Sequence, residues 1–345
     1  MKVWPRASNA ALVQATFKQQ PEDFQVIEQL DVADEGAGEH QWLWIRKRGA
    51  NTRYVAEQLA KFAGVSARQV SFSGMKDRQA LTWQWFSIQL PGQPLLDWQG
   101  LQHSEFAVEQ AIQRSKKLPT GLHKANTFVI RLRDVAAPEA FVERATAVAQ
   151  QGVPNYFGEQ RFGHGGNNFQ RASDWLLNGQ KRIKKAQRSL WLSTIRSYLF
   201  NDVVAARLGL GTNTLLAGDC VRLAGSRSQF SVEQWGAEEQ ARLAAGDIAL
   251  TAPLPGSGSW GSDAEALAFE QQALEPHKAL LEGLADAGVR ADRRVLWLRP
   301  EAFTATAEGS DVVLTFRLPS GAFATTFLDE LITTENNQHD EHTTE

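Results

Sequence analysis

The sequence predicts an α+β protein in which one domain is inserted into another, and three observations indicate this. Segments with the two-residue apolar period of strands fill most of residues 1–151, whereas helical spacing dominates 152–303. Strand-like alternation returns in 304–334, a part too small to fold by itself. We therefore expect 1–151 and 304–334 to form one mixed-sheet domain around a mostly helical insertion. The polar, acidic tail at 335–345 is expected to be disordered.

Six strands are expected in the first domain, because aromatic and β-branched residues alternate there with polar ones or form short apolar runs. Asn51 or Thr52 can cap a helix expected at 52–63 by accepting a hydrogen bond from a free backbone N–H group. A second helix is expected at 138–151. The expected strands lie at 24–32, 42–47, 69–72, 83–90, 106–112 and 127–133.

The run Gly152-Val153-Pro154-Asn155 marks the change of pattern, because glycine and proline interrupt regular structure. Beyond it, apolar residues recur at the spacing of helices. The expected elements are helices at 168–178, 188–207, 235–245 and 263–287, then a strand at 312–317, a turn at 318–321 and an amphipathic helix at 322–331.

The composition is that of a soluble globular protein, with 43% apolar and 22% charged residues among 345. No apolar run is long enough to span a bilayer and the N-terminus lacks a signal-peptide core, so we expect a cytoplasmic protein. The single Cys220 excludes an internal disulfide framework and a cysteine-cluster metal site, and the seven histidines lack zinc-binding spacing. Because no exposed apolar heptad pattern is present, we expect a monomer without an obligate protein partner.

The net charge of −3 hides a segregation of charge along the chain. Four of the 39 acidic residues lie in 335–345, which contains no lysine or arginine. Two stretches, 110–133 and 181–201, contain no acidic residue at all. Local basic patches decide contact with a phosphate backbone, although two solvated faces explain the pattern equally well. The candidate backbone-binding residues are Lys116, Lys117 and Lys124 in the first stretch and Lys181, Lys184 and Lys185 in the second.

The most informative residue is Asp77, in the run Ser73-Gly74-Met75-Lys76-Asp77-Arg78. Its carboxylate follows a glycine turn, lies between two cations and precedes a strand. Neighbouring cations keep a carboxylate ionised, and an ionised carboxylate can act as a nucleophile or a base. A simpler interpretation is a turn or helix-capping aspartate.

Two further segments combine polar and aromatic residues. In Lys124-Ala125-Asn126-Thr127-Phe128, the asparagine can donate and accept hydrogen bonds at a base edge and the phenylalanine can lie against a base. When this segment is considered alone, a simpler interpretation is a turn asparagine followed by a phenylalanine in the core. In the aromatic, glycine-containing loop 154–163, Arg161 can bridge a phosphate or a carboxylate, unless the loop is a buried domain junction.

Phe24, after Pro21-Glu22-Asp23, and Phe323, in Ser320-Gly321-Ala322-Phe323-Ala324, each stand where a turn meets a regular element. Core packing is the default interpretation for both aromatics. They become candidates for a site only if they converge on Asp77.

In this order, these segments resemble the TruD family of tRNA pseudouridine synthases, as do Arg299-Pro300 and the run 256–261. The resemblance extends from about Pro21 to Leu331. It implies a pseudouridine synthase catalytic domain, a mixed and mainly antiparallel sheet flanked by helices, with a TRUD domain inserted at 152–303. It further implies a tRNA partner, uridine-13 as the usual target and no cofactor or metal.

The resemblance also assigns roles to individual residues. Asp77 resembles the catalytic aspartate, and Phe24, Asn126 and Phe323 resemble the residues that line the uridine pocket. Phe128 occupies the place where most other pseudouridine synthases have tyrosine. We add Lys76 and Arg161 as expected substrate-binding residues. The family often has glycine before the asparagine, whereas this chain has Ala125.

Pseudouridine formation breaks the N1–C1′ bond and rejoins the base through C5, so the uridine must first leave the folded RNA. Asp77 could attack C1′, attack the base or remove the 2′ proton, and the sequence does not choose among these routes. A non-catalytic RNA-binding module would share the basic stretches. A glycoside hydrolase would need a second carboxylate, for which Glu159 is the nearest candidate. The sequence does not distinguish which tRNAs are substrates.

Overall fold

The computed structural model describes residues 2–8, 10–179, 182–212 and 214–333, so the predicted acidic tail lies outside the described residues. The chain divides into two compact units. The sheet unit consists of the described residues within Leu12–Gln150, Pro300–Ala324 and Leu331–Glu345. The insertion unit consists of the described residues within Met1–Ala11, Gln151–Arg299 and Thr325–Glu330. None of the described helices is both long and apolar enough to cross a membrane.

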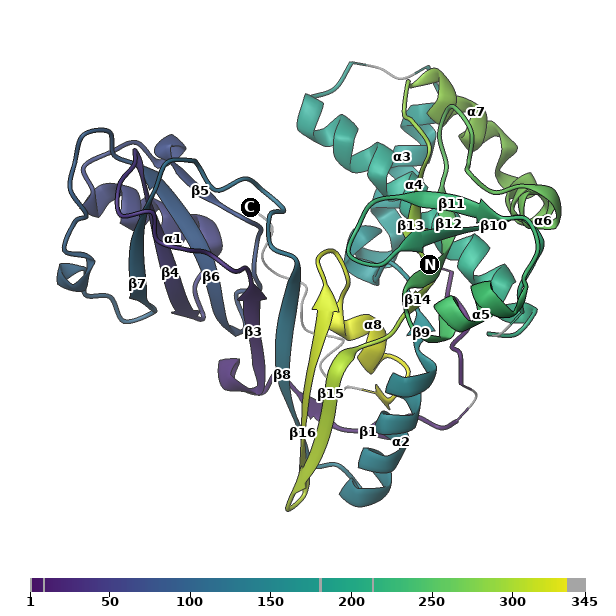
Figure 1. Cartoon of the computed structure of the whole chain (residues 1–345), viewed down its shortest axis with the longest axis horizontal. Coiled ribbons are helices and arrows are strands. Elements are labelled where there is room, and N and C mark those ends of the chain that lie inside the picture. Colours follow the sequence, from purple (N-terminus) through teal and green to yellow (C-terminus); the bar gives the residue numbers. More distant parts are fainter. Residues whose placement is uncertain (1, 9, 180–181, 213, 334–345) are drawn as a thin grey trace. The chain divides into compact units, whose positions relative to one another are not determined.

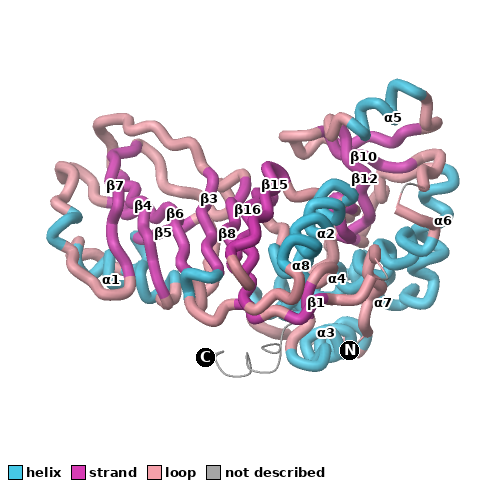
Figure 2. Tube along the Cα trace, turned by 90° about the horizontal axis from the view of Figure 1, so that it is seen from below, coloured by secondary structure: helices cyan, strands magenta, loops and turns pink. Residues whose placement is uncertain are grey.

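The sheet unit is built on a nine-stranded mixed sheet, whose strands lie side by side in Figures 1 and 2. Seven strands follow the order β15-β16-β8-β3-β6-β4-β7, while β2 pairs with β8 and β5 with β6. All neighbours are antiparallel except β3 and β6. The strands are β2 (Thr16–Phe17), β3 (Phe24–Gln29), β4 (His40–Arg48), β5 (Val70–Phe72), β6 (Leu81–Gln89), β7 (Phe106–Arg114), β8 (Ala125–Arg133), β15 (Glu301–Glu308) and β16 (Asp311–Pro319).

All six strands expected in the first part are confirmed, with boundaries shifted by up to three residues. The closing strand β16 pairs with β8 along eight residues, so the last part of the chain completes the same sheet. Near it, two short strands, β1 (Val13–Gln14) and β17 (Ile332–Thr333), pair in parallel.

Helix α1 (Thr52–Phe62) covers one face of β4 and β6 because its apolar side chains recur at helical spacing. Val55 and Leu59 are buried with Leu43, Ile45 and Phe86 in one core. The side chain of Asn51 caps this helix, as predicted, by accepting from the N–H group of Arg53. The other helix of this unit is α2 (Pro138–Gln151). Helix α8 (Ala324–Leu328), shorter than expected, falls almost entirely in the insertion unit.

The insertion unit contains the expected helices and also strands that were not predicted. A four-stranded antiparallel sheet has the order β11-β10-β12-β13, and β9 pairs with β14. The expectation of a mostly helical insertion is therefore met only in part. The elements are β9 (Val153–Pro154), α3 (Asn167–Leu177), α4 (Lys185–Gly209), β10 (Asp219–Leu223), β11 (Gln229–Val232), α5 (Ala237–Ala244), β12 (Ile248–Leu254), α6 (Ala264–Leu274), α7 (Lys278–Asp286), β13 (Asp292–Val295) and β14 (Trp297–Leu298).

The absence of strand β12 from the sequence prediction has a physical explanation. Strand β12 is buried along most of its length, so its residues do not alternate between apolar and polar. It also contains Pro253, which cannot donate a ladder hydrogen bond and argues against a strand when only the sequence is read. In the same unit, Pro276 lies in a short 3-10 turn that divides the helix expected at 263–287 into α6 and α7.

Candidate active site

The loop that carries Asp77 connects β5 with β6 and is anchored on both sides. The N–H group of Lys76 donates to the hydroxyl of Thr52, the first residue of α1, over 3.1 Å. The side-chain amide of Gln84 on β6 donates to the carbonyl of Gly74 over 3.0 Å. These two hydrogen bonds hold the loop in place. The Asp77 side chain is 35% exposed, so its carboxylate remains open to solvent.

The two carboxylate oxygens of Asp77 have different partners. Oδ1 accepts from the N–H group of Gln79 over 2.9 Å, which is the predicted turn contact. Oδ2 lies 2.5 Å from the Lys18 ammonium nitrogen, which is also 4.3 Å from the centre of the Phe24 ring. The backbone of Lys18 has a φ of 57°, a left-handed conformation that is rare for a residue with a side chain. Lys18 therefore joins Asp77 to Phe24.

Sequence reasoning missed Lys18 and assigned its role to the flanking cations. Among the described residues, Lys18 is the one that forms an ion pair with Asp77. Arg78 instead donates to the carbonyl of Gly49 over 3.3 Å, and Lys76 points to other partners. Lys18 precedes Asp77 by 59 residues, so no local pattern signals their contact.

Lys76 is the centre of a buried polar network. Its ammonium nitrogen lies 2.6 Å from the side-chain oxygen of Asn126 and 3.3 Å from the carboxylate of Glu28. Glu28 also accepts hydrogen bonds from the hydroxyl of Ser73 and from the N–H group of Trp85. Burial lowers the pKa of Lys76, and the charge of Glu28 opposes this shift. The network fixes the amide of Asn126.

The turn that carries Phe323 begins beside this network. The N–H group of Ser320 donates to the carbonyl of Lys124 over 3.0 Å, and its hydroxyl lies 3.0 Å from Nε2 of His123. Burial lowers the pKa of His123, and the nearby Lys76 charge acts in the same direction. The Phe323 side chain is 40% exposed. An exposed aromatic side chain thus follows a turn that is tied to the strand of Asn126.

The register of the sheet brings three predicted residues onto one face. Val26 of β3 lies opposite Phe128 of β8, and residues opposite each other share a face with every second neighbour along each strand. Phe24, Asn126 and Phe128 therefore lie on the same face. The rings of Phe24 and Phe128 are 6.0 Å apart, and Phe128 stacks on Phe316 at 5.6 Å. Phe24 and Phe128 are each only 6% exposed, which agrees with the simpler interpretation of both as core residues.

Arg161 belongs to the insertion unit, where it is half-buried in a 3-10 turn. Its guanidinium carbon lies 5.6 Å from the centre of the Phe157 ring, and that of Arg294 lies 4.2 Å from the same ring. Burial lowers the pKa of Arg161, and it lowers the pKa of Arg294 to about 10. The positive charge of Arg161 is thus held beside an aromatic ring.

The candidate backbone-binding lysines occupy two places in the chain. Lys116, Lys117 and Lys124 are exposed between β7 and β8 of the sheet unit, the unit that contains Asp77. Lys184 and Lys185 are exposed at the start of α4 in the insertion unit, whereas Lys181 lies outside the described residues.

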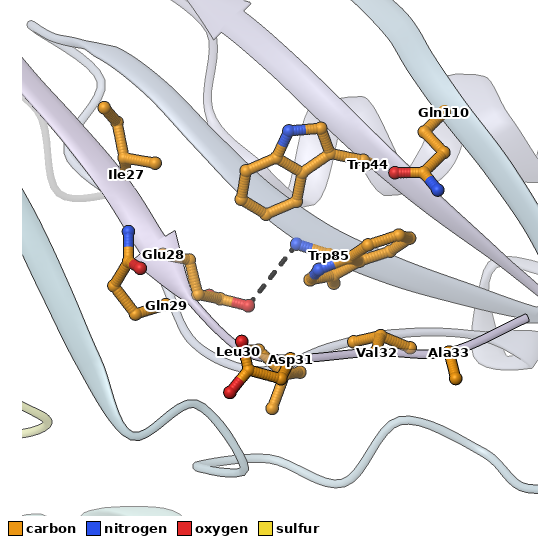
Figure 3. Close-up of a pocket in the computed structure, with 10 residues that line it drawn as sticks. All are labelled: Ile27, Glu28, Gln29, Leu30, Asp31, Val32, Ala33, Trp44, Trp85 and Gln110. Atoms are coloured by element: carbon orange, nitrogen blue, oxygen red, sulfur yellow. Dashed lines mark hydrogen bonds between the residues drawn. The ribbon is translucent and has the colours of Figure 1, made fainter.

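Figure 3 shows the residues that line a hollow of about 630 Å³. The alternation of side chains along β6 places this hollow on the sheet face opposite the Asp77 loop. Trp44 and Trp85 form part of its wall, with their rings 5.3 Å apart. Successive residues of a strand point to opposite faces, and Gln84, the neighbour of Trp85, contacts the Asp77 loop. Glu28 lines the edge of the hollow and also contacts Lys76, so it joins the two faces.

Comparison with known proteins identifies the family. The family model described as "tRNA pseudouridine synthase D (TruD)" matches residues 6–183 and 167–331. The chain belongs to the TruD family. This confirms the resemblance found in the sequence.

Relatives in the TruD family match nearly the whole chain. The tRNA pseudouridine synthase D of Idiomarina loihiensis is 54% identical over 331 residues, covering 95% of each chain. That of Aeromonas hydrophila is 44% identical, covering 96% of this chain and 94% of the relative. The crystal structure of a putative TruD from Methanosarcina mazei superposes with a TM-score of 0.76, 21% identity and 96% coverage of both chains. This last similarity shows that the fold is shared.

Proposed function

We propose that this chain isomerises uridine-13 of tRNA to pseudouridine, with Asp77 as the catalytic residue. The observation that carries the proposal is the ion pair between Asp77 and Lys18 on an anchored, solvent-open loop. Membership of the TruD family supports the reaction class. The ammonium of Lys18 pairs with the carboxylate and fixes its orientation toward the side of Phe24.

The reaction is internally balanced. The N1–C1′ bond breaks, a C5–C1′ bond forms, the proton leaves C5 and N1 gains a proton. No electrons or other atoms are exchanged, so the proposal includes no cofactor. The Asp77 carboxylate can attack C1′, attack the base or remove the 2′ proton, and all three routes need the ionised form.

The uridine must be extruded, and we assign its pocket to Phe24, Asn126 and Phe323. Because Lys76 donates to the side-chain oxygen of Asn126, the amide nitrogen is left to donate to a uracil carbonyl. The exposed ring of Phe323 can stack on the base. Lys76 thus acts through Asn126 rather than on the substrate directly.

We further propose that the insertion unit is the TRUD domain and helps to bind tRNA. The half-buried charge of Arg161 suits a phosphate of the RNA. The exposed lysines would hold further phosphates: Lys116, Lys117 and Lys124 in the sheet unit, and Lys184 and Lys185 in the insertion unit. We propose the same role for Lys181, which lies outside the described residues. We propose that the enzyme acts as a monomer in the cytoplasm, where its substrate is found.

The test compares wild-type protein with Asp77→Ala and Asp77→Asn on unmodified tRNA. Pseudouridine does not change the RNA mass, so it is detected by carbodiimide labelling followed by primer extension. We expect tRNA treated with wild-type protein to carry the carbodiimide label at position 13. Both variants should lose turnover, while their tRNA affinity stays within about twofold of wild type, since Asp77 makes no favourable contact with a phosphate.

Asp97→Asn is a matched control. Asp97 also accepts from the N–H group two residues later, over 3.1 Å, as Asp77 does. It should retain wild-type turnover. Isomerisation by Asp77→Ala at the wild-type rate would refute the catalytic assignment, and tRNA binding without any isomerisation by wild-type protein would indicate a binding module.

A further inference from the structure

Lys47 on β4 has no solvent-exposed surface and is among the largest fully buried side chains of the described residues. Its ammonium nitrogen donates to the carbonyl of Asp77 over 2.7 Å, to that of Ala50 over 2.9 Å and to that of Lys76 over 3.5 Å. Three carbonyls thus match the three ammonium protons. Within the described part of the chain, Lys47 forms no ion pair with a carboxylate, although burying an unpaired charge is costly.

The surroundings of Lys47 contain few charges. In the sheet, Lys47 pairs with Thr82 of β6 on one side and with Phe106 of β7 on the other, and neither residue is charged. The loop above it contributes the charges of Asp77, which favours the ammonium, and Lys76, which disfavours it. Burial, the largest effect, acts in the same direction as the Lys76 charge; together they outweigh the charge of Asp77 and lower the pKa of Lys47 to about 8.

Asp77 is therefore held between two lysines. Lys18 contacts its carboxylate from the solvent side, and Lys47 contacts its backbone carbonyl from the interior. The two groups also interact through their charges, because the Asp77 carboxylate favours the ammonium form of Lys47.

We propose that Lys47 is a positioning residue for the isomerisation, whose charged ammonium fixes the backbone of Asp77 and so aims its carboxylate. The inference rests on the proposed function. When the ammonium loses its proton, two N–H donors remain for three carbonyls and the buried positive charge disappears. The Asp77 loop then loses an anchor, and turnover falls as pH rises through about 8.

If Lys47 only stabilised the fold, its effect would depend on pH in a different way. The native pKa of Lys47 lies below its ordinary value of 10.5, so between about 8 and 10.5 the unfolded chain binds more protons than the native one. The contribution of this group to the stability therefore rises with pH over that window, whereas its contribution to turnover falls. Loss of activity without loss of folded protein is the mark of the positioning role.

The kinetic test measures single-turnover isomerisation of tRNA from pH 6 to 10 by wild-type protein and Lys47→Met, with folding checked at each pH. We expect the wild-type rate to fall about tenfold per pH unit above about 8. Lys47→Met should lose roughly 100-fold in kcat at pH 7, with KM within about twofold, and should lack this alkaline limb. Lys61→Met removes an exposed lysine of α1 and should match wild-type protein.

A second measurement does not depend on the reaction or on the folding of Lys47→Met. Lysine carrying ¹³C at Cε reports the titration of Lys47 by NMR in the wild-type protein and in Asp77→Asn. We expect a midpoint near 8 in wild-type protein and a lower one in Asp77→Asn, because that variant removes the charge that favours the ammonium. A Lys47 midpoint that is the same in both proteins, or wild-type kcat in folded Lys47→Met, would overturn the proposal. Absence of isomerisation by wild-type protein would instead overturn the proposed function, and the NMR comparison would still decide whether Lys47 and Asp77 are coupled.

Discussion

Replacing Lys76 by methionine should strongly destabilise the sheet unit, because the carboxylate of Glu28 would stay buried without its cation. The Glu28 side chain is 0% exposed and that of Lys76 only 6%. Breaking a buried ion pair by removing one partner costs about 3–5 kcal/mol. Glu28 would keep its hydrogen bonds from Ser73 and Trp85, so we expect the lower end of this range.

The pair is best tested by a double-mutant cycle with Glu28→Gln. A neutral glutamine needs no cation, so Lys76→Met combined with Glu28→Gln should recover at least half of the loss caused by Lys76→Met alone. Urea unfolding followed by tryptophan fluorescence and circular dichroism gives the free energies of unfolding. The tRNA assay applied to the same proteins should show reduced turnover in Lys76→Met, because Asn126 loses its fixed orientation.

Arg46→Met provides the matched comparison. Arg46 pairs with Glu109 on the same sheet over 2.8 Å, but the two side chains are 43% and 37% exposed. An exposed pair contributes about 0–1 kcal/mol, so Arg46→Met should cost little. If Lys76→Met also costs less than about 1 kcal/mol, the pair behaves like an exposed one and the reasoning from burial is refuted.

Two other predictions separate binding from folding. Phe323→Ala should lower kcat/KM by roughly 5- to 150-fold, since stacking on a base contributes about 1–3 kcal/mol, and should leave stability unchanged because the ring is exposed. Phe128→Ala should instead cost about 3–5 kcal/mol of stability, and equal effects of the two changes on unfolding would contradict this division. Changing Lys181, Lys184 and Lys185 together to alanine should weaken tRNA binding and reduce the slope of log affinity against log salt by about 2–3. The control Lys278→Ala removes an exposed lysine of α7 and should change neither the affinity nor the slope. An unchanged slope in the triple variant would show that this part of the chain is only solvated.

Local patterns in the sequence were sufficient for much of the sheet unit. Its six expected strands either alternate in hydrophobicity or form short apolar runs, because one or both of their faces are buried, and the cap of α1 needs only residues that are adjacent in the chain. The Asp77 loop was also recognisable, because its glycine, its charges and the strand that follows lie within a few residues. The order of several such segments indicated the TruD family, which the comparisons confirm.

The partners of Asp77 were decided by the tertiary structure. Lys18 and Lys47 precede it by 59 and 30 residues, and each contact depends on how the sheet brings separate strands and loops together. Lys76 is next to Asp77 in the chain, yet it points to Glu28 and Asn126 because the buried carboxylate requires a cation. Adjacent residues alone therefore indicated Asp77 as the candidate catalytic residue, whereas pairing between distant segments determined which charges hold it in place.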